Sequence, residues 1–245
     1  PGFEIIPYND LDALSAALRD EDVAGFLVEP IQGEAGVIVP DDGYLAEAKK
    51  RCEAANVLFI AYEIQTGLGR TGRMLACDHE NVRPDIVLLG KALSGGTLPV
   101  SAVLCDDEIM MTIQPGEHGS TYGGNPLACA VAMASLRVLT ENDMIKNAAE
   151  MGELMRVELG KIDSPFLGKV RGKGLLNAIV IDHPKAEAAW NLCLAMKDHA
   201  NSRGKKGLLA KPTHGDRIRF APPLIITRDQ VMEAVGIIKE GFAKM

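Results

Sequence analysis

Polar side chains follow three apolar segments of the sequence, at the point where each segment ends. Lys91 comes directly after IVLLG, Gln65 follows VLFIAYEI, and residues 29–34 (EPIQGE) follow GFLV. Short apolar runs of this kind are typical of buried strands. Because ligand sites in parallel sheets lie outside the carboxyl ends of the strands, we expect these polar groups to line a pocket at one sheet edge.

Lys91 is the member of this set with a reactive side chain. A lysine at the end of a buried strand is expected to be partly desolvated, which lowers the pKa of its amine. A neutral amine can form a Schiff base with a carbonyl compound. The sequence leaves a second interpretation open, in which Lys91 only extends its charged end to water from an apolar strand.

A glycine-rich stretch and an arginine bring groups that could bind anions. Residues 119–125 (GSTYGGN) offer the hydroxyls of Ser120 and Thr121 and flexible amides, which suit a phosphate, or form an ordinary turn before a helix. Arg219 lies in the apolar run IRFAPPL, where a guanidinium is costly to bury without an anionic partner. A structural ion pair and a carboxylate-binding role are both compatible with that position.

Two patterns that resemble nucleotide-binding motifs do not fit their context. Residues 67–72 (GLGRTG) match G-x-G-x-x-G, but residues 63–66 separate them from the strand and Pro84 limits any helix after them. Lys91 follows a glycine, yet the other residues of a P-loop are missing. We therefore expect neither kind of nucleotide site here.

The composition is that of an ordinary globular protein. The chain has 245 residues, of which 47% are hydrophobic and 24% charged, and its net charge is −7. The acidic balance argues against nucleic acid as a partner, and no apolar run approaches the ~18 residues of a membrane helix. The five cysteines have spacings that suit neither zinc nor a disulfide framework, so we expect no metal site and buried, reduced thiols.

Strand-like and helix-like segments alternate in the first part of the chain and predict an α/β fold. The expected strands are 25–28, 57–61, 85–89 and 100–104, and the expected helices are 10–18, 44–55 and 126–139, the last capped by Asn125. This order favours parallel strands with helices on both faces. After residue 140 we expect helices at 144–159, 187–199 and 230–242, strands at 174–181 and 217–220, and a polar loop at 201–207.

Taken together, these stretches resemble one family. The segments VEPIQGEAGVIVP, FIAYEIQTGLGRTG, PDIVLLGKALSGG, GEHGSTYGGNPLACAVA and IRFAPPL are similar to those of class III pyridoxal-phosphate-dependent aminotransferases of fold type I, most closely the ornithine aminotransferases. The resemblance implies the C-terminal part of a large mixed-sheet domain at 1–141 and a C-terminal α+β small domain at 142–245. It covers only the later part of a family member, and NSRGKK looks like a local insertion.

The resemblance implies roles for individual residues around pyridoxal 5′-phosphate (PLP). Lys91 matches the Schiff-base lysine, and Gln65 matches the glutamine near the phenolic oxygen of the cofactor. Thr121, with Ser120 beside it, matches the phosphate ligand that is donated across a homodimer interface. Part of the phosphate site belongs to the first part of the family's chain, which these residues do not include.

The resemblance also implies how two unlike substrates are handled. Arg219 would bind the α-carboxylate of 2-oxoglutarate or glutamate, and Glu34 would neutralise Arg219 while ornithine occupies the site. The expected reaction moves the δ-amino group of ornithine to 2-oxoglutarate, in the mitochondrial matrix or alternatively in the cytosol. An acetylornithine-type aminotransferase shares Lys91 and GSTYGGNP, although GEHG and AKPTHG favour ornithine itself.

Tyr62 departs from the family pattern. Family members have an aspartate before Glu63, and this aspartate pairs with the pyridine nitrogen so that the ring can act as an electron sink. A tyrosine is neutral and can offer only one hydroxyl hydrogen bond. A catalytically impaired or structural aminotransferase homologue is therefore a further interpretation of the chain.

Overall fold

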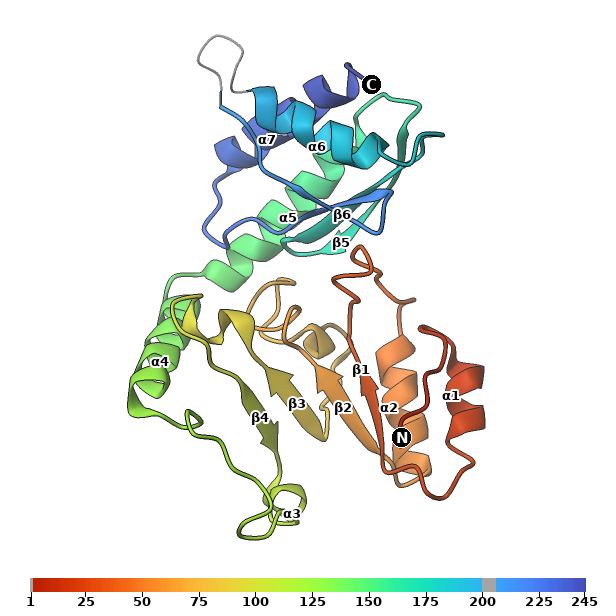
Figure 1. The fold of residues 1–245 in the computed structure, drawn as a ribbon, viewed down its shortest axis with the longest axis vertical. Helices are drawn as coiled ribbons and strands as arrows, with labels where there is room; N and C mark the ends of the chain where they lie inside the picture. The colour runs from red at the N-terminus through yellow and green to blue at the C-terminus, as the bar shows by residue number, and fades with distance from the viewer. Residues whose placement is uncertain (1, 200–205) are drawn as a thin grey trace. The chain divides into compact units, whose positions relative to one another are not determined.

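The described part of the chain forms two compact units. The computed structural model describes residues 2–199 and 206–245 (Figure 1). The first unit comprises Pro1–Pro30, Pro40–Leu68 and Met74–Asn142, and the second comprises Ile31–Val39, Gly69–Arg73 and Asp143–Met245. The ranges 1–141 and 142–245 remain a prediction about the domains of a longer protein. Residues 201–205 of the expected polar loop, and with them most of NSRGKK, lie outside the described residues.

A four-stranded mixed sheet forms the centre of the first unit. Its strands are β1 (Gly25–Val28), β2 (Leu58–Tyr62), β3 (Ile86–Leu89) and β4 (Ala102–Cys105), in the order β1-β2-β3-β4. The first three strands are parallel, as expected, but β4 is antiparallel to β3. A parallel pair needs a crossover helix, and between β3 and β4 the chain forms only the short 3-10 turn η2 (Lys91–Ser94).

Three helices of the first unit begin within one residue of the predicted positions: α1 (Leu11–Ala17), α2 (Tyr44–Ala54) and α4 (Pro126–Glu141). The 3-10 turn η1 (Ala76–Glu80) and the short helix α3 (Asp107–Met110) were not predicted, and α2 packs directly against β2. The predicted cap is present, because the side chain of Asn125 accepts a hydrogen bond from the N–H of Ala128 at 2.8 Å. Proline at the first helical position then fixes the start of α4.

The two faces of the sheet are covered unequally. Val28, Phe59 and Ala61 are buried together with residues of α2 in one core cluster. On the other face, Leu27 is 51% exposed and Val103 is 54% exposed. The expectation of a sheet buried on both faces is therefore wrong at these positions, because α1 and α2 cover only one face and β1 is an edge strand.

The cysteines depart in part from the expectation of buried thiols. Cys52, Cys77 and Cys193 are buried, whereas Cys105 is only partly covered and Cys129 is exposed. Cys129 is exposed because it lies on the outward side of α4, three residues beyond Pro126.

A four-stranded antiparallel sheet and three helices form the second unit. The strands are β5 (Leu167–Lys173), β6 (Leu176–Ile181), β7 (Lys211–Thr213) and β8 (Arg217–Phe220), and the helices are α5 (Met144–Gly160), α6 (Ala188–Asp198) and α7 (Arg228–Phe242). The sheet order is β5-β6-β8-β7. The single strand expected at 174–181 is wrong in its start, because a turn at Gly174 separates β5 from β6. The stretch GKVRGK lacks the apolar alternation that would reveal β5.

The helices and a separate loop cover opposite faces of this second sheet. Ile179, Ile181, Ile218 and Phe220 face the helices in the main core of the unit. Leu176 and Ala178 instead pack with Ile31 and Val37, which belong to the loop Ile31–Val39. This loop is thereby held directly over one face of the sheet, and it carries Glu34.

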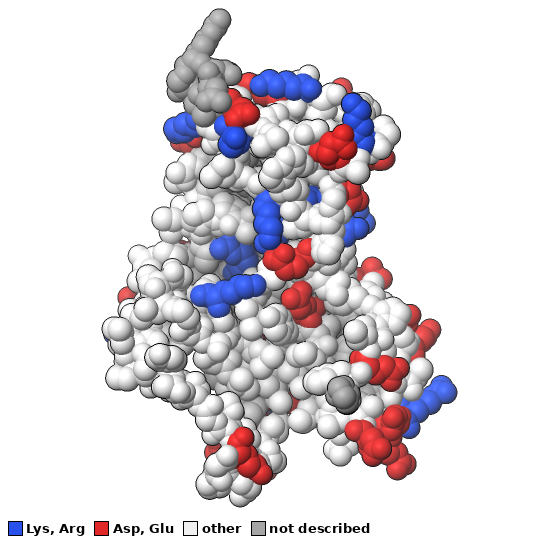
Figure 2. All heavy atoms as spheres, viewed as in Figure 1, with Lys and Arg blue, Asp and Glu red and all other residues white. Residues whose placement is uncertain are grey.

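Charged side chains are unevenly distributed on the face shown in Figure 2. Acidic residues gather over α1 and the loop after it, where the sequence has Asp12, Asp20, Glu21 and Asp22. Asp12 lies in the first turn of α1, where a carboxylate interacts favourably with the helix dipole. None of the helices in the described residues combines the length and apolar character that a membrane span requires.

Candidate active site

The parallel strands of the first unit bring three predicted residues to one sheet edge. Tyr62 is the last residue of β2 and pairs in register with Leu88 of β3. Gln65 follows three residues after β2, and Lys91 follows two residues after β3. The carboxyl ends of the two strands therefore place a phenol, an amide and an amine at the same edge, whereas residues 31–34 of the third predicted segment belong to the second unit.

Lys91 has an unusual backbone conformation. Its φ is 42°, in the left-handed region that a lysine rarely adopts. Such conformations cost free energy and are found most often at functional sites. The side chain is exposed in this chain, so the expectation of partial desolvation is wrong here, because Lys91 begins the turn η2 beyond the end of the strand rather than lying on the buried face.

A buried carboxylate that the sequence reasoning missed fixes the turn that carries Gln65. Glu63 is 1% exposed, and its carboxylate accepts hydrogen bonds from the hydroxyl of Thr66 and from the N–H of Cys77, the latter at 2.9 Å. The N–H of Gly67 also donates to the backbone oxygen of Glu63 at 2.9 Å. Burial, with Glu63 nearby, raises the pKa of the Cys77 thiol, which therefore stays protonated. The available signal was a carboxylate directly after a buried strand.

The candidate phosphate ligands lie on the turn before α4. Ser120 and Thr121 are both exposed, and the N–H of Gly123 donates to Ser120 Oγ at 2.9 Å. The helix after this turn packs against η2, where Ser135 Oγ lies 3.5 Å from the backbone oxygen of Ala92. This contact ties the turn with the two hydroxyls to the same part of the unit as Lys91.

The remaining predicted pair, Glu34 and Arg219, lies in the second unit. Arg219 Nη1 donates to Glu34 Oε1 at 2.8 Å, which confirms the predicted ion pair. The hydrogen bond from Arg219 and its charge hold the pKa of the Glu34 carboxyl below its usual value, with a smaller contribution from Lys211. Lys211 Nζ lies 3.5 Å from Glu34 Oε2, so one carboxylate faces two cations.

Strand register explains why several cations gather under the loop Ile31–Val39. Arg171 pairs with Ala178, Ala178 pairs with Arg219, and Arg219 pairs with Lys211. Residues paired in this way point to the same face of a sheet, and Arg217 joins them because it lies two residues before Arg219. Ala178 is fully buried and small, which leaves space for the loop above this row.

Two further arginines, not identified from the sequence, hold the backbone of the loop. Arg171 Nε and Nη2 donate to the oxygen of Gly36 at 3.0 and 2.7 Å, and Arg217 Nη1 donates to the oxygen of Ala35 at 2.8 Å. Burial lowers the pKa of Arg171, and the charge of Arg217 adds to the effect. A Cβ at Gly36, where φ is +93°, would lie 2.3 Å from Arg217 Cδ, so only glycine fits here.

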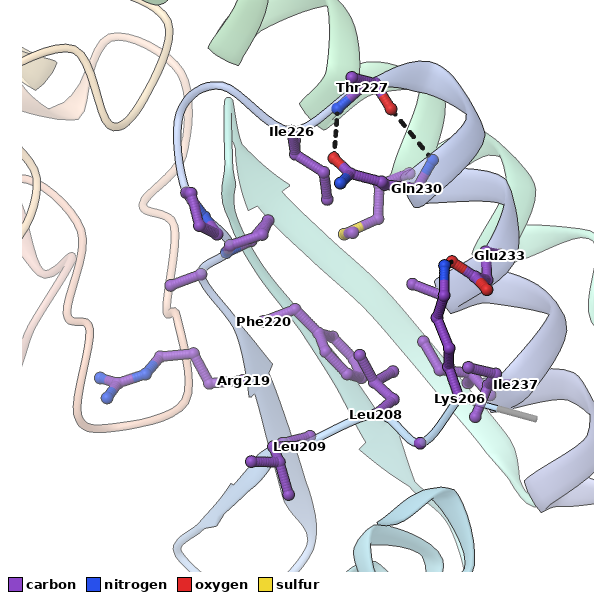
Figure 3. A pocket seen from close by; sticks show the side chains of 18 of the residues that line it. Lys206, Leu208, Leu209, Arg219, Phe220, Ile226, Thr227, Gln230, Glu233 and Ile237 are labelled. Atoms are coloured by element: carbon purple, nitrogen blue, oxygen red, sulfur yellow. Dashed lines mark hydrogen bonds and ion pairs between the residues drawn. The ribbon is translucent and has the colours of Figure 1, made fainter. Parts of the chain in front are cut away.

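A large pocket of the second unit lies on the other side of β8 from the ion pair. The pocket has a volume of about 970 Å³ and is lined mainly by apolar side chains of β8, α7 and residues 206–211. Figure 3 shows Phe220 pointing toward it, whereas the side chain of Arg219 points away. Since neighbouring strand residues face opposite sides, the Arg219 side chain leaves the other face of β8 from Phe220, although Arg219 and Lys211 both border the pocket.

The donor groups of the first unit suit PLP. An exposed primary amine at Lys91 can react with an aldehyde, the amide of Gln65 can donate a hydrogen bond to a phenolic oxygen, and hydroxyls on a glycine-rich turn can bind a phosphate. Tyr62 is the one member that lacks the chemistry expected of its position, because a phenol brings no negative charge at neutral pH.

Comparisons with known proteins point to one family. Residues 5–242 match the family model of aminotransferase class III. The chain is 64% identical over 240 residues to mitochondrial ornithine aminotransferase from Rattus norvegicus, and 56% identical over 245 residues to that from Drosophila melanogaster. These matches cover 98% and 100% of this chain but only 53% and 55% of the relatives, so the chain spans about half their length.

Solved structures are also similar to this chain over its full length, among them two aminotransferases. An acetylornithine aminotransferase from Elizabethkingia anophelis has a TM-score of 0.94 and 54% identity, with 100% of this chain and 63% of that chain covered. An ornithine aminotransferase from Toxoplasma gondii, described with partial occupancy of PLP at its active site, has a TM-score of 0.94 and 46% identity, with 100% and 56% covered. These neighbours confirm the predicted fold class, an α/β aminotransferase fold.

Proposed function

The chain belongs to the class III aminotransferases, and from this premise we propose that the protein transfers the δ-amino group of ornithine to 2-oxoglutarate, giving glutamate semialdehyde and glutamate. The observation that carries the proposal is the Glu34–Arg219 ion pair. An enzyme that takes one substrate with a carboxylate at this position and another without it needs a cation that can be neutralised. Glu34 can neutralise Arg219 in this way, because the two side chains form an ion pair.

PLP is the cofactor that the family implies, and side chains from two copies of the chain would hold it. Lys91 would bind the aldehyde and Gln65 would donate to the phenolic oxygen, whereas Ser120 and Thr121 would bind the phosphate of the cofactor in the other subunit of a homodimer. When bound, the cofactor supplies an electron sink for the substrate carbon that loses a proton. The fixed turn between Glu63 and Gly67 keeps Gln65 in place during the reaction.

Lys91 then acts as the base and acid of the reaction. With ornithine bound at this edge of the sheet, the amine of Lys91 would remove a proton from Cδ of the substrate. The same amine would then hold that proton and give it back as an acid, so one side chain would serve both roles. The exposed position of Lys91 at the sheet edge is compatible with a substrate that approaches from solvent.

The choice of amino donor tests this function directly. Full-length protein loaded with PLP should lose its cofactor absorption band on addition of ornithine and not on addition of N-acetylornithine. The reverse preference would favour an acetylornithine aminotransferase, the activity named for the Elizabethkingia neighbour. A band that persists with both donors, even over hours, would favour the non-enzymatic interpretation that Tyr62 suggests.

Replacing Glu34 should shift the donor preference. In Glu34→Ala, Arg219 loses its anionic partner at 2.8 Å and becomes available to a substrate carboxylate. We expect the rate with glutamate relative to ornithine to rise by about tenfold, the effect of ~1.4 kcal/mol in competition for the arginine. Single-turnover rates with each donor measure the ratio. An unchanged ratio would show that the pair is only structural.

We also propose that the whole protein is a homodimer in the mitochondrial matrix, with the cytosol as the alternative. The helix α4 exposes Leu127, Met133 and Val138 at 64%, 54% and 48%, and apolar exposure of this extent is typical of association surfaces. The relatives named above carry mitochondrial names. Sedimentation of the full-length protein as a monomer would contradict the first part, and a purely cytosolic fraction would contradict the second.

A further inference from the structure

We propose that Lys211 is a specificity-determining residue, which holds the Glu34 carboxylate while Arg219 binds the carboxylate of a dicarboxylate substrate. The proposal rests on the function above and assigns a positioning role to a residue outside the pair already described. In this role Lys211 acts through Glu34, which it contacts at 3.5 Å.

The arrangement of charges is the first support for this role. Lys211 and Arg219 are directly paired residues of neighbouring antiparallel strands, so their side chains leave the same face of the sheet. Like charges in this arrangement repel, and Glu34 lies between them with one carboxylate oxygen toward each. Oε1 is 2.8 Å from Arg219 Nη1, and Oε2 is 3.5 Å from Lys211 Nζ.

The fixed backbone of the loop is the second support. Arg171 and Arg217 bind the oxygens of Gly36 and Ala35, and Gln32 and Ile38 exchange two backbone hydrogen bonds of 3.0 Å at the base of the loop. The loop backbone therefore cannot move away from the sheet when a substrate competes for Arg219. Glu34 has to leave Arg219 by rotation of its side chain alone.

The exposed fractions of the Glu34, Arg219 and Lys211 side chains indicate the direction in which the Glu34 side chain can rotate. The side chain of Arg219 is only 16% exposed, whereas those of Glu34 and Lys211 are 56% and 66% exposed. Rotation within the half-open part of the site takes the carboxylate toward Lys211 and lets the 3.5 Å contact close into a full ion pair. Lys211 thus lowers the free energy of the state in which Glu34 has left Arg219, more than that of the resting state.

Binding of glutarate, a dicarboxylate without an amino or keto group, tests the proposal without requiring turnover. In full-length protein loaded with PLP, Lys211→Met should raise the dissociation constant for glutarate about two- to fivefold, the effect of one partly exposed ion pair. It should raise KM for 2-oxoglutarate by the same factor and leave the single-turnover rate with ornithine within a factor of about two. Lys211→Arg, which keeps the charge, should restore the dissociation constant.

Two controls separate this role from a structural one. Lys161→Met removes another exposed, ion-paired lysine of the second unit, which lies 2.7 Å from Glu158, and should leave glutarate binding unchanged. In a Glu34→Gln background, Lys211→Met should change glutarate binding by less than about twofold, since the carboxylate it holds is gone. A full effect in that background would overturn the proposal, because Lys211 would then attract the substrate itself.

The remaining outcomes distinguish the two proposals. An unchanged dissociation constant in Lys211→Met would overturn the role of Lys211 and leave the proposed function standing. Glutarate binding with the expected dependence on Lys211, in a protein that accepts no amine from ornithine, would refute the proposed function alone. A protein that does not bind glutarate at all would overturn both, since Arg219 would not be a carboxylate site.

Discussion

Replacing Tyr62 with aspartate should increase the rate of the ornithine half-reaction by about 10²-fold in the full-length protein. In the family, a carboxylate at this position faces the pyridine nitrogen of the bound cofactor and keeps it protonated. A phenol, unlike a carboxylate, brings no full negative charge to the pyridine nitrogen and can offer only one hydroxyl hydrogen bond. Losing a charge partner of the reacting group costs about 3 kcal/mol in the transition state, which corresponds to the factor stated. Stopped-flow absorbance under single-turnover conditions measures the rate.

The position of Tyr62 makes this substitution compatible with the fold. Tyr62 is the last residue of β2 and half-buried, on the opposite face of the sheet from the buried Phe59 and Ala61. The carboxyl end of the strand is a place where a polar side chain can reach solvent or a ligand. Binding of the cofactor through Lys91, Ser120 and Thr121 does not involve Tyr62, so the cofactor content should stay the same.

Two neutral substitutions serve as controls for the charge. Tyr62→Asn has the shape of aspartate without its charge, and Tyr62→Phe removes only the hydroxyl. Neither should raise the rate more than about threefold, because neither brings an anion to the pyridine nitrogen. A starting protein that is already fast, with no gain in Tyr62→Asp, would show that this electrostatic explanation is wrong.

The fold could be predicted where local patterns decide it. The helices that became α2, α5 and α7 have a clear apolar face, and β2 and β3 are short apolar runs, so periodicity places them within a residue or two. β5 and β7 were missed, since one is rich in glycine and lysine and the other has only three residues. Neither strand has a local signal, and both form because β6 and β8 provide edges to pair with.

The candidate site could also be predicted only in part, because some of its residues come together through strand pairing that leaves no local signal in the sequence. Lys91, Gln65 and Tyr62 follow or end strands, so sequence order alone brings them to one edge. The cations around Glu34 come from strands whose spatial order, β5-β6-β8-β7, differs from their order in the chain. The row that joins Arg171, Arg219 and Lys211 depends on this long-range register, which no local pattern reveals. The position of Glu63 directly after a buried strand was a local signal, but its hydrogen bonds to Thr66 and Cys77 form only once the turn is folded.

Loss of Lys91 should have the largest effect on activity. In a Tyr62→Asp background, where turnover is fast enough to follow, we expect Lys91→Ala to reduce the rate with ornithine by about 10⁴-fold or more, because one side chain supplies both the covalent anchor and the base. Lys91→Arg should be equally impaired, since a guanidinium keeps the charge but neither reacts with an aldehyde nor gives up its proton near neutral pH. A small loss in Lys91→Arg would mean that charge alone matters.

The lysine that is covalently attached to PLP can be identified independently of the reaction rate. Reduction of the PLP-loaded full-length protein with borohydride, followed by peptide mapping, should place the pyridoxyl group on the peptide with Lys91. Other lysines, such as Lys173 and Lys211, lie in strands of the second unit and should stay unlabelled. A label on either of them would end the assignment of Lys91, whatever the rates show. Its left-handed backbone, with φ at 42°, would then need a purely structural explanation, because the conformation costs free energy that a catalytic position repays.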